Sequence, residues 1–202
     1  MFKQIDYLEV VNSTNEYLKA FTPGGECRAV VAREQTAGKG RHGRHWYSPP
    51  GQGLYASYLF YPSWPSARSE WLNMIAALAV VRAVRDLGTT ENALTVKPPN
   101  DILIGDRKVC GILVELSSLK ERISWAIVGV GINLFQKEFP QPGFHLEATS
   151  LTLEGLPTID AIGLFRRLTS QIEELYRRVE GEEWEEVESE YREKIRGGRA
   201  PV

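Results

Sequence analysis

The chain has little cysteine and no long apolar run. Its 202 residues include two cysteines, Cys27 and Cys110, too few for the disulfide framework that stabilises small secreted domains. The longest apolar run, residues 74–81, is far shorter than the roughly 20 residues that cross a bilayer, and the first residues contain no apolar signal core. These absences predict a soluble, cytoplasmic protein with no membrane partner.

The chain also lacks a strong net charge. Lys and Arg number 24 against 26 Asp and Glu, so no general positive field favours nucleic acid as the main partner. The basic excess is local, because the first 150 residues hold 16 basic and 14 acidic side chains. A chain of this length can form one sizeable core, and we expect one main domain.

The most distinctive segment is residues 35–46, which read QTAGKGRHGRHW. Its spacing satisfies G-x-G-x-x-G, but a dinucleotide-binding turn needs a helix directly after it, and the residues that follow here are YSPPG. The chain has no G-x-x-x-x-G-K-[ST] loop and no protein-kinase motif. The segment is therefore either a loop whose N–H groups and cations wrap phosphate oxygens or a solvated glycine-rich hairpin.

Hydrophobic periodicity predicts strands on both sides of this segment. Buried strands over 28–32 and 53–60 would be joined by it. Further strands, most simply antiparallel, are predicted over 95–97, 102–104, 109–115 and 123–133. In the last of these, Gly129 and Gly131 lie on one face, where bare backbone would let a ligand lie close.

Four helices are predicted. One begins at Ser13, with Glu16 completing a capping box, and ends at about residue 21. A longer helix begins near Trp71 and ends at Gly88. Two amphipathic helices follow Pro157, with apolar stripes from Ile159 to Val179 and from Trp184 to Ile195.

Several blocks, in order along the chain, resemble the signature motifs of biotin protein ligases. The first is Ser13-Thr14-Asn15, and the second is the glycine-rich segment continued by Ser48, Pro49 and Gly51. The third is KPPND at 97–101 followed by GDRKVCGILVE at 105–115, and the fourth is VGVGIN at 128–133, with ATSL at 148–151 as a weaker fifth. The resemblance covers about residues 8–195.

The resemblance implies a fold, a reaction and partners. The fold is α/β (α+β), with a mixed, mostly antiparallel sheet packed against helices, as in class II aminoacyl-tRNA synthetases and biotin or lipoate ligases. Such enzymes join biotin to ATP with Mg²⁺, giving biotinyl-adenylate and pyrophosphate, and then pass biotin to one lysine of a biotin carboxyl carrier protein, the carrier domain of acetyl-CoA carboxylase. Residues 1–196 would form the catalytic domain, and 197–202 a short tail where the family's small β domain would begin.

The resemblance also assigns roles to residues. Contact between two anions, the biotin carboxylate and the α-phosphate, needs cations and backbone donors, and Lys108 and Arg41 match the family's catalytic cations. Asp101 would accept a proton from the carrier lysine and belong, with Asn100, to the ATP and magnesium group. The positions that match the family's biotin and ATP contacts are Ser13, Thr14, Asn15, Gln35, Gly38, Lys39, Gly40, Arg41, His42, Gly43, Arg44, Trp46, Lys97, Asn100, Asp101, Lys108, Gly111, Leu113, Gly129, Gly131 and Asn133.

Residue types alone leave other roles open at four of these positions. Ser13 can cap a helix, and Asp101 can be an Asn-Asp turn residue. Trp46 can stack on adenine or close the loop over the adenylate, but it can equally be a core aromatic of a hairpin. Asn133 can cap a strand end instead of contacting the nucleotide.

The histidines and Cys110 are predicted to have no metal or nucleophilic role. His42 and His45 have no partner at metal-ligand spacing, so a zinc site is not expected. Cys110 has no histidine near it in sequence, and cysteine is commonly buried, so a small core residue is expected rather than an acyl nucleophile.

The chain departs from the family pattern in three places. Pro98 replaces a tryptophan in the block that lines the nucleotide site, which stiffens the backbone and removes an N–H. The family's C-terminal β domain, which helps to cover ATP, is expected to be absent. No DNA-binding region precedes Phe2, so repressor activity is not expected, whereas a homodimer through a sheet edge is.

Two other functions remain open. A lipoate or octanoate transfer protein would share the fold, but the glycine and arginine loop together with Lys108 is typical of the biotin branch. A non-catalytic homologue would hold biotin or biotinyl-adenylate without turnover, and ligand would stabilise it thermally.

Overall fold

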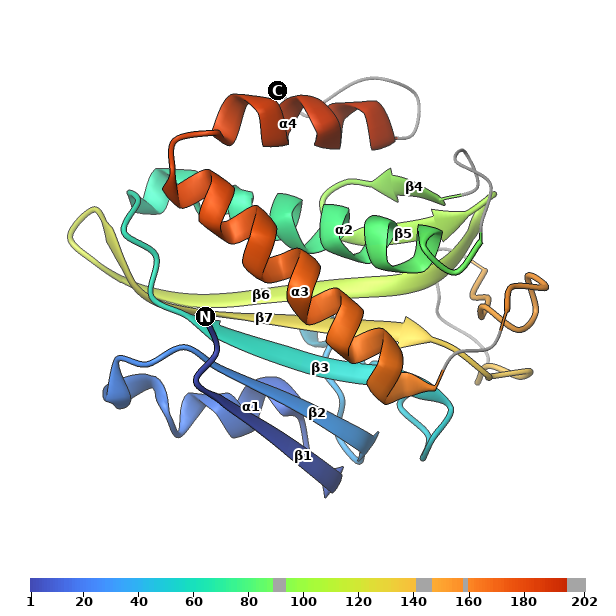
Figure 1. The fold of residues 1–202 in the computed structure, drawn as a ribbon. Helices are drawn as coiled ribbons and strands as arrows, with labels where there is room; N and C mark the ends of the chain where they lie inside the picture. The colour runs from blue at the N-terminus through green and yellow to red at the C-terminus, as the bar shows by residue number, and fades with distance from the viewer. Residues whose placement is uncertain (89–93, 141–146, 158–159, 196–202) are drawn as a thin grey trace.

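The computed structural model of the protein describes residues 1–88, 94–140, 147–157 and 160–195. A seven-stranded sheet forms its centre (Figure 1), in the order β1-β2-β3-β7-β6-β5-β4. The strands are β1 (Gln4–Val11), β2 (Arg28–Gln35), β3 (Gly53–Phe60), β4 (Leu94–Lys97), β5 (Asp101–Ile104), β6 (Arg107–Leu119) and β7 (Arg122–Asn133). The pair β1 and β2 is parallel and the other five pairs are antiparallel, so the predicted mixed, mostly antiparallel α/β (α+β) fold is confirmed.

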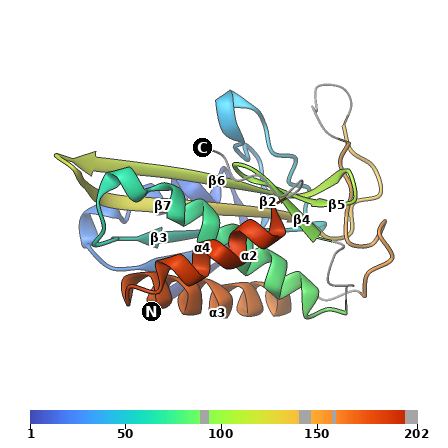
Figure 2. The same ribbon diagram turned by 90° about the horizontal axis from the view of Figure 1, so that it is seen from above.

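Helices cover both faces of the sheet. They are α1 (Thr14–Lys19), α2 (Glu70–Arg85), α3 (Ala161–Glu180) and α4 (Trp184–Lys194). Figure 2 shows α2, α3 and α4 together on one side of the sheet, with the loop between β2 and β3, drawn in light blue, on the other. Helix α1 packs on β2, β3 and β7. No described helix is long and apolar enough to span a membrane.

Side-chain alternation in β2 explains the layers. Ala29 and Val31 pack into the main core beneath α2 and α3, whereas Val30 packs with Leu18 of α1 in a second, smaller core. Successive residues of a strand point to opposite faces. The central strand β3 is consequently buried along all eight residues, because both of its faces are covered.

The main core depends on the stripe predicted for the third helix. Phe165, Leu168, Ile172, Leu175 and Val179 of α3 are all buried. The ring of Phe165 stacks on Tyr58 of β3 at a centroid distance of 6.0 Å. Ile159, the first member of that stripe in the sequence, and the tail 197–202 lie outside the described residues.

One strand was missed, and two local expectations were wrong. Strand β1 was not predicted, because its half-exposed edge position gives it no continuous apolar run. The capping box does not form: Ser13 makes no side-chain cap hydrogen bond, and Glu16 instead pairs with Lys19 and Lys39. Strand β2 continues to Gln35, and α1 ends at Lys19.

Shortening a core side chain of α3 should destabilise the protein strongly. Leu168 is fully buried, whereas Leu119, at the end of β6, is 71% exposed. We expect Leu168→Ala to lower the free energy of unfolding by about 2–5 kcal/mol, through lost transfer energy and a cavity. Leu119→Ala should change it by less than about 0.5 kcal/mol. Urea denaturation followed by circular dichroism measures both, and equal losses would contradict the assignment of α3 to the core.

Candidate active site

A cavity of about 630 Å³ lies on the face of the sheet that carries α1. The start of α1, the loop between β2 and β3, the turn between β4 and β5, and strands β6 and β7 all contribute to its lining. Every position matched to the family's biotin and ATP contacts lines this cavity except Gly38 and Gly43. Blocks far apart in sequence meet here because β7 pairs with both β3 and β6.

The loop between β2 and β3 folds over the cavity as a small hairpin. Residues Lys39 and His45 pair across it, and the N–H of Trp46 donates to the Gly38 carbonyl at 2.9 Å. Its tip is a single helical turn, Arg41–Gly43, in which His42 and Gly43 have φ values of 57° and 73°. Glycine adopts this left-handed region without strain.

Gly38 and Gly43 therefore shape the loop and do not line the cavity. A Cβ on Gly38 would lie 2.6 Å from the carbonyl oxygen of Trp46 and 2.8 Å from the hydroxyl of Ser48. Gly43 has open space around it but a positive φ. Backbone geometry therefore explains why both of these motif positions are glycine.

Two side chains connect the loop to the rest of the protein. The Lys39 ammonium lies 2.5 Å from the Glu16 carboxylate of α1, and the Arg41 guanidinium donates to the side-chain oxygen of Asn100 at 3.3 Å. Asn100 in turn donates to the Ile112 carbonyl at 2.9 Å. The loop is thus bound on one side to α1 and on the other to the β4–β5 turn.

A lysine and a carboxylate meet at one end of the cavity. Lys108 Nζ lies 2.5 Å from Asp101 Oδ1 and 5.3 Å from the centroid of the Trp46 ring. The two side chains are about one-fifth exposed, at 23% and 18%. A partly desolvated cation of this kind interacts strongly with an arriving anion.

A second group of polar side chains, all buried, lies around the start of α1. The N–H and hydroxyl of Thr14 donate to Gln35 Oε1 at 2.9 and 3.0 Å, and Gln35 Nε2 donates to Ser48 at 2.9 Å. The hydroxyl of Ser57, on β3, lies 2.7 Å from Thr14 and 2.6 Å from Asn15 Oδ1. Ser57 was missed from the sequence because a lone serine within an apolar strand carries no motif.

The glycines of β6 and β7 make room for protein side chains. A Cβ on Gly129 would lie 2.3 Å from Asn15 Oδ1, and one on Gly131 would lie 2.4 Å from the indole nitrogen of Trp46. A Cβ on Gly111 would lie 2.8 Å from the same indole ring. Asn15 and Trp46 thus lie against the bare backbone of these glycines.

The remaining predicted residues are placed as follows. Asn133 lines the cavity, but its amide also donates to the Thr149 carbonyl at 2.8 Å, so it joins β7 to the following segment. His42 and His45 are exposed on the loop, and the described residues contain no group of three His, Cys, Asp or Glu side chains placed to hold a metal. Cys110 is fully buried in the main core, where burial raises the pKa of its thiol.

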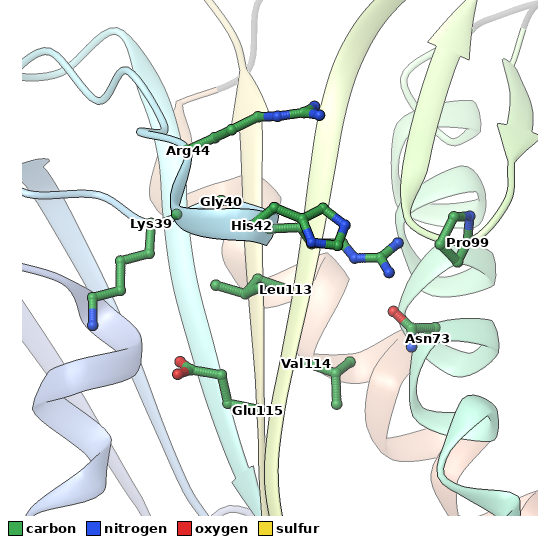
Figure 3. Close-up of a pocket in the computed structure, with 11 residues that line it drawn as sticks. Lys39, Gly40, His42, Arg44, Asn73, Pro99, Leu113, Val114 and Glu115 are labelled. Carbon is green, nitrogen blue, oxygen red and sulfur yellow. The ribbon is translucent and has the colours of Figure 1, made fainter. Parts of the chain in front are cut away.

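A second cavity of about 590 Å³ adjoins the same loop. In Figure 3 its lining includes Lys39, Gly40, His42 and Arg44 of the loop above Leu113, Val114 and Glu115 of β6, with Asn73 of α2 and Pro99 on the right. Asn73 was not predicted from the sequence as a site residue. Glu115 was noted only as the last residue of the GDRKVCGILVE block. The loop therefore contributes to the lining of both cavities.

Comparisons with known proteins agree with this geometry. The model of the biotin/lipoate A/B protein ligase family matches residues 7–133. The bifunctional ligase/repressor BirA of Bacillus subtilis is 34% identical over 181 residues, which cover 88% of this chain and 55% of that protein. The biotin--[acetyl-CoA-carboxylase] ligase of Mycobacterium tuberculosis is 32% identical over 178 residues, covering 85% and 64% of the two chains.

Solved structures give the same result. The biotin protein ligase from Aquifex aeolicus in complex with biotin and ATP superimposes with a TM-score of 0.78 at 32% identity, over 96% of this chain and 79% of that one. The Leishmania major enzyme in complex with biotinyl-5-AMP gives 0.79 at 27% identity, over 100% and 85%. The chain spans about half the length of the first curated relatives it matches. By family model, sequence and fold, the chain belongs to the biotin/lipoate A/B protein ligase family.

Proposed function

We propose that this chain is an ATP-dependent biotin protein ligase, which forms biotinyl-adenylate and transfers biotin to a lysine of a biotin carboxyl carrier protein. The observation that carries the proposal is the contact of 2.5 Å between Lys108 and Asp101 in a cavity covered by a cationic glycine loop. The names of the relatives support it, and so does the similarity to a ligase solved with biotin and ATP.

In the first step, a carboxylate oxygen of biotin attacks the α-phosphorus of ATP, and pyrophosphate leaves. Both reactants are anions, so the step needs cations at their point of contact. The Lys108 ammonium would leave the Asp101 carboxylate and bind the biotin carboxylate. Arg41, Lys39 and the loop N–H groups would hold phosphate oxygens. Mg²⁺ is usually held by one or two carboxylates together with substrate phosphates, and Asp101 with Asn100 fits that role.

In the second step, the carrier lysine attacks the acyl carbon, and AMP leaves. The lysine amine must lose a proton to become a stable amide, and Asp101 is the carboxylate closest to Lys108 that can accept it. The same carboxylate therefore serves first to neutralise Lys108 and then as a base.

The competing functions predict different chemistry. A lipoate or octanoate transfer protein would accept an aliphatic acyl group in place of biotin, whereas the relatives from Mycobacterium tuberculosis and Aquifex aeolicus are named as biotin ligases. A non-catalytic homologue would bind biotin without exchanging pyrophosphate. The cytoplasmic location and the homodimer stay predictions.

Lys108→Ala should abolish most of the activity. Loss of one preorganised donor typically costs about 3 kcal/mol or about 100-fold in rate, so we expect biotin transfer to an apo carrier domain, with ATP and Mg²⁺, to fall at least about 100-fold. Carrier mass and biotin-dependent exchange of pyrophosphate into ATP measure the two steps.

The matched control is Lys3→Ala, since Lys3 is 75% exposed and pairs with Glu26. It should leave both rates unchanged. An inactive wild type that biotin nevertheless stabilises thermally would support the binding homologue instead, and a Lys108→Ala variant of normal activity would contradict the role of Lys108.

Asp101→Asn should separate the two steps. Transfer should fall about 100-fold or more, because an amide cannot accept the proton of the carrier lysine. Pyrophosphate exchange should fall less, because the amide oxygen of Asn can still bind Mg²⁺. Equal losses of both rates would show that Asp101 acts in adenylation and not as the base. Asp86→Asn, at the exposed end of α2, is the control for the loss of one carboxylate.

A further inference from the structure

Asn15 is a buried amide whose orientation is fixed by its neighbours. It is 3% exposed and lines the main cavity. Its Nδ2 donates to Glu115 Oε2 at 2.8 Å and lies 3.4 Å from the Leu113 carbonyl oxygen. Its Oδ1 lies 2.6 Å from the Ser57 hydroxyl. Rotating the amide by 180° would place an oxygen against the Glu115 carboxylate, so one orientation is strongly favoured.

This orientation decides what Asn15 can offer to a ligand. A primary amide has two N–H donors and an oxygen with two lone pairs. Glu115 and the Leu113 carbonyl use both donors, whereas Ser57 leaves one lone pair of Oδ1 unused. Asn15 is therefore an acceptor for a ligand N–H and has no N–H left to donate.

The other oxygen of Glu115 connects to the glycine loop. Glu115 Oε1 lies 2.8 Å from Lys19 Nζ, which lies 2.6 Å from Glu16 Oε1. The same Glu16 oxygen is 2.5 Å from Lys39 Nζ. Hydrogen bonds from Lys19 and then from Lys39 lower the pKa of Glu16, which keeps it ionised at neutral pH. Figure 3 shows Lys39 and Glu115 on the same side of the second cavity, with Leu113 beside them.

We propose that Glu115 is a positioning residue for the ring end of the substrate. One carboxylate oxygen sets the Asn15 amide so that it accepts an N–H from the ureido ring of biotin. The other, through Lys19 and Glu16, holds Lys39 and with it the closed loop. This inference rests on the proposed function for the identity of the substrate, but the contacts themselves exist without any ligand.

The first test uses the unliganded protein. In the wild type, the Asn15 side-chain amide protons should exchange slowly with solvent, as nuclear magnetic resonance measures. In Glu115→Ala their exchange should be at least about tenfold faster, because a charge-assisted hydrogen bond is lost, and the backbone amides of residues 38–46 should also exchange faster. Glu26→Ala, which removes a carboxylate that is 64% exposed, should change neither.

Lys19→Met tests the connection of Glu115 to the loop separately from its contact with Asn15. It keeps the contact between Glu115 and Asn15 but breaks the connection to Glu16, so exchange should rise in residues 38–46 and not at Asn15. This variant also serves if Glu115→Ala fails to fold. Unchanged exchange of the loop in Lys19→Met would contradict the role of Glu115 in holding the loop. Unchanged exchange of Asn15 in Glu115→Ala would contradict its role in fixing the Asn15 amide.

The second test measures binding by calorimetry. Glu115→Ala, which affects both Asn15 and the loop, should raise the Kd for biotin about tenfold. Lys19→Met, which affects the loop alone, should raise it much less. In an Asn15→Ala background, Glu115→Ala should have less effect, because residues that act through one another are not additive. Equal losses of biotin affinity in Glu115→Ala and Lys19→Met, or full additivity, would contradict the role of Glu115 in positioning Asn15. A wild type that binds no biotin would contradict the proposed function, while the exchange experiment would still decide whether Glu115 fixes Asn15.

Discussion

The antiparallel pairing of β7 with both β3 and β6 is the constraint on which the site depends. It places Gly129 and Gly131 of β7 opposite Ser57 and Tyr55 of β3 and opposite Leu113 and Gly111 of β6. The even positions of β7, Val128, Val130 and Ile132, pack into the main core. On the other face of β7, Gly129 and Gly131 contribute no side chains, which leaves room for Asn15 and Trp46, and the cavity lies there.

Cations around the cavity are neutralised by partners that a substrate can replace. Lys108 pairs with Asp101, and Lys39 with Glu16, while Arg41 contacts a neutral amide, Asn100. Desolvated charges are costly, and the pair with Asp101 lowers that cost for Lys108, which is 23% exposed, whereas Lys39 is 45% exposed. A carboxylate or phosphate that enters gains only the difference between its own contacts and those it displaces, so the site favours a ligand that meets several cations at once.

The sequence predicted the parts of the molecule that follow local rules. β3 and α2 to α4 follow from apolar runs and stripes. The expected site positions other than Gly38 and Gly43 line one cavity. What it did not predict depends on three-dimensional neighbours. Glu16 has the residue type that a capping box needs, but its carboxylate accepts hydrogen bonds from two lysines, one of them 23 residues away. Ser57 and Glu115 join the site only through the register of β3 and β6 against β7.

Trp46 illustrates how the glycines and the loop depend on each other. Its indole lies where side chains on Gly111 and Gly131 would otherwise be, and its buried N–H has no hydrogen-bond partner among the described residues. A buried unpaired donor costs about 1–3 kcal/mol, so this position of the loop contains an unsatisfied group. The contacts of one indole with two glycines hold the loop against β6 and β7. The cations that the loop carries are thereby placed at the lining of the cavity, so the glycines of β6 and β7 act on the site through Trp46.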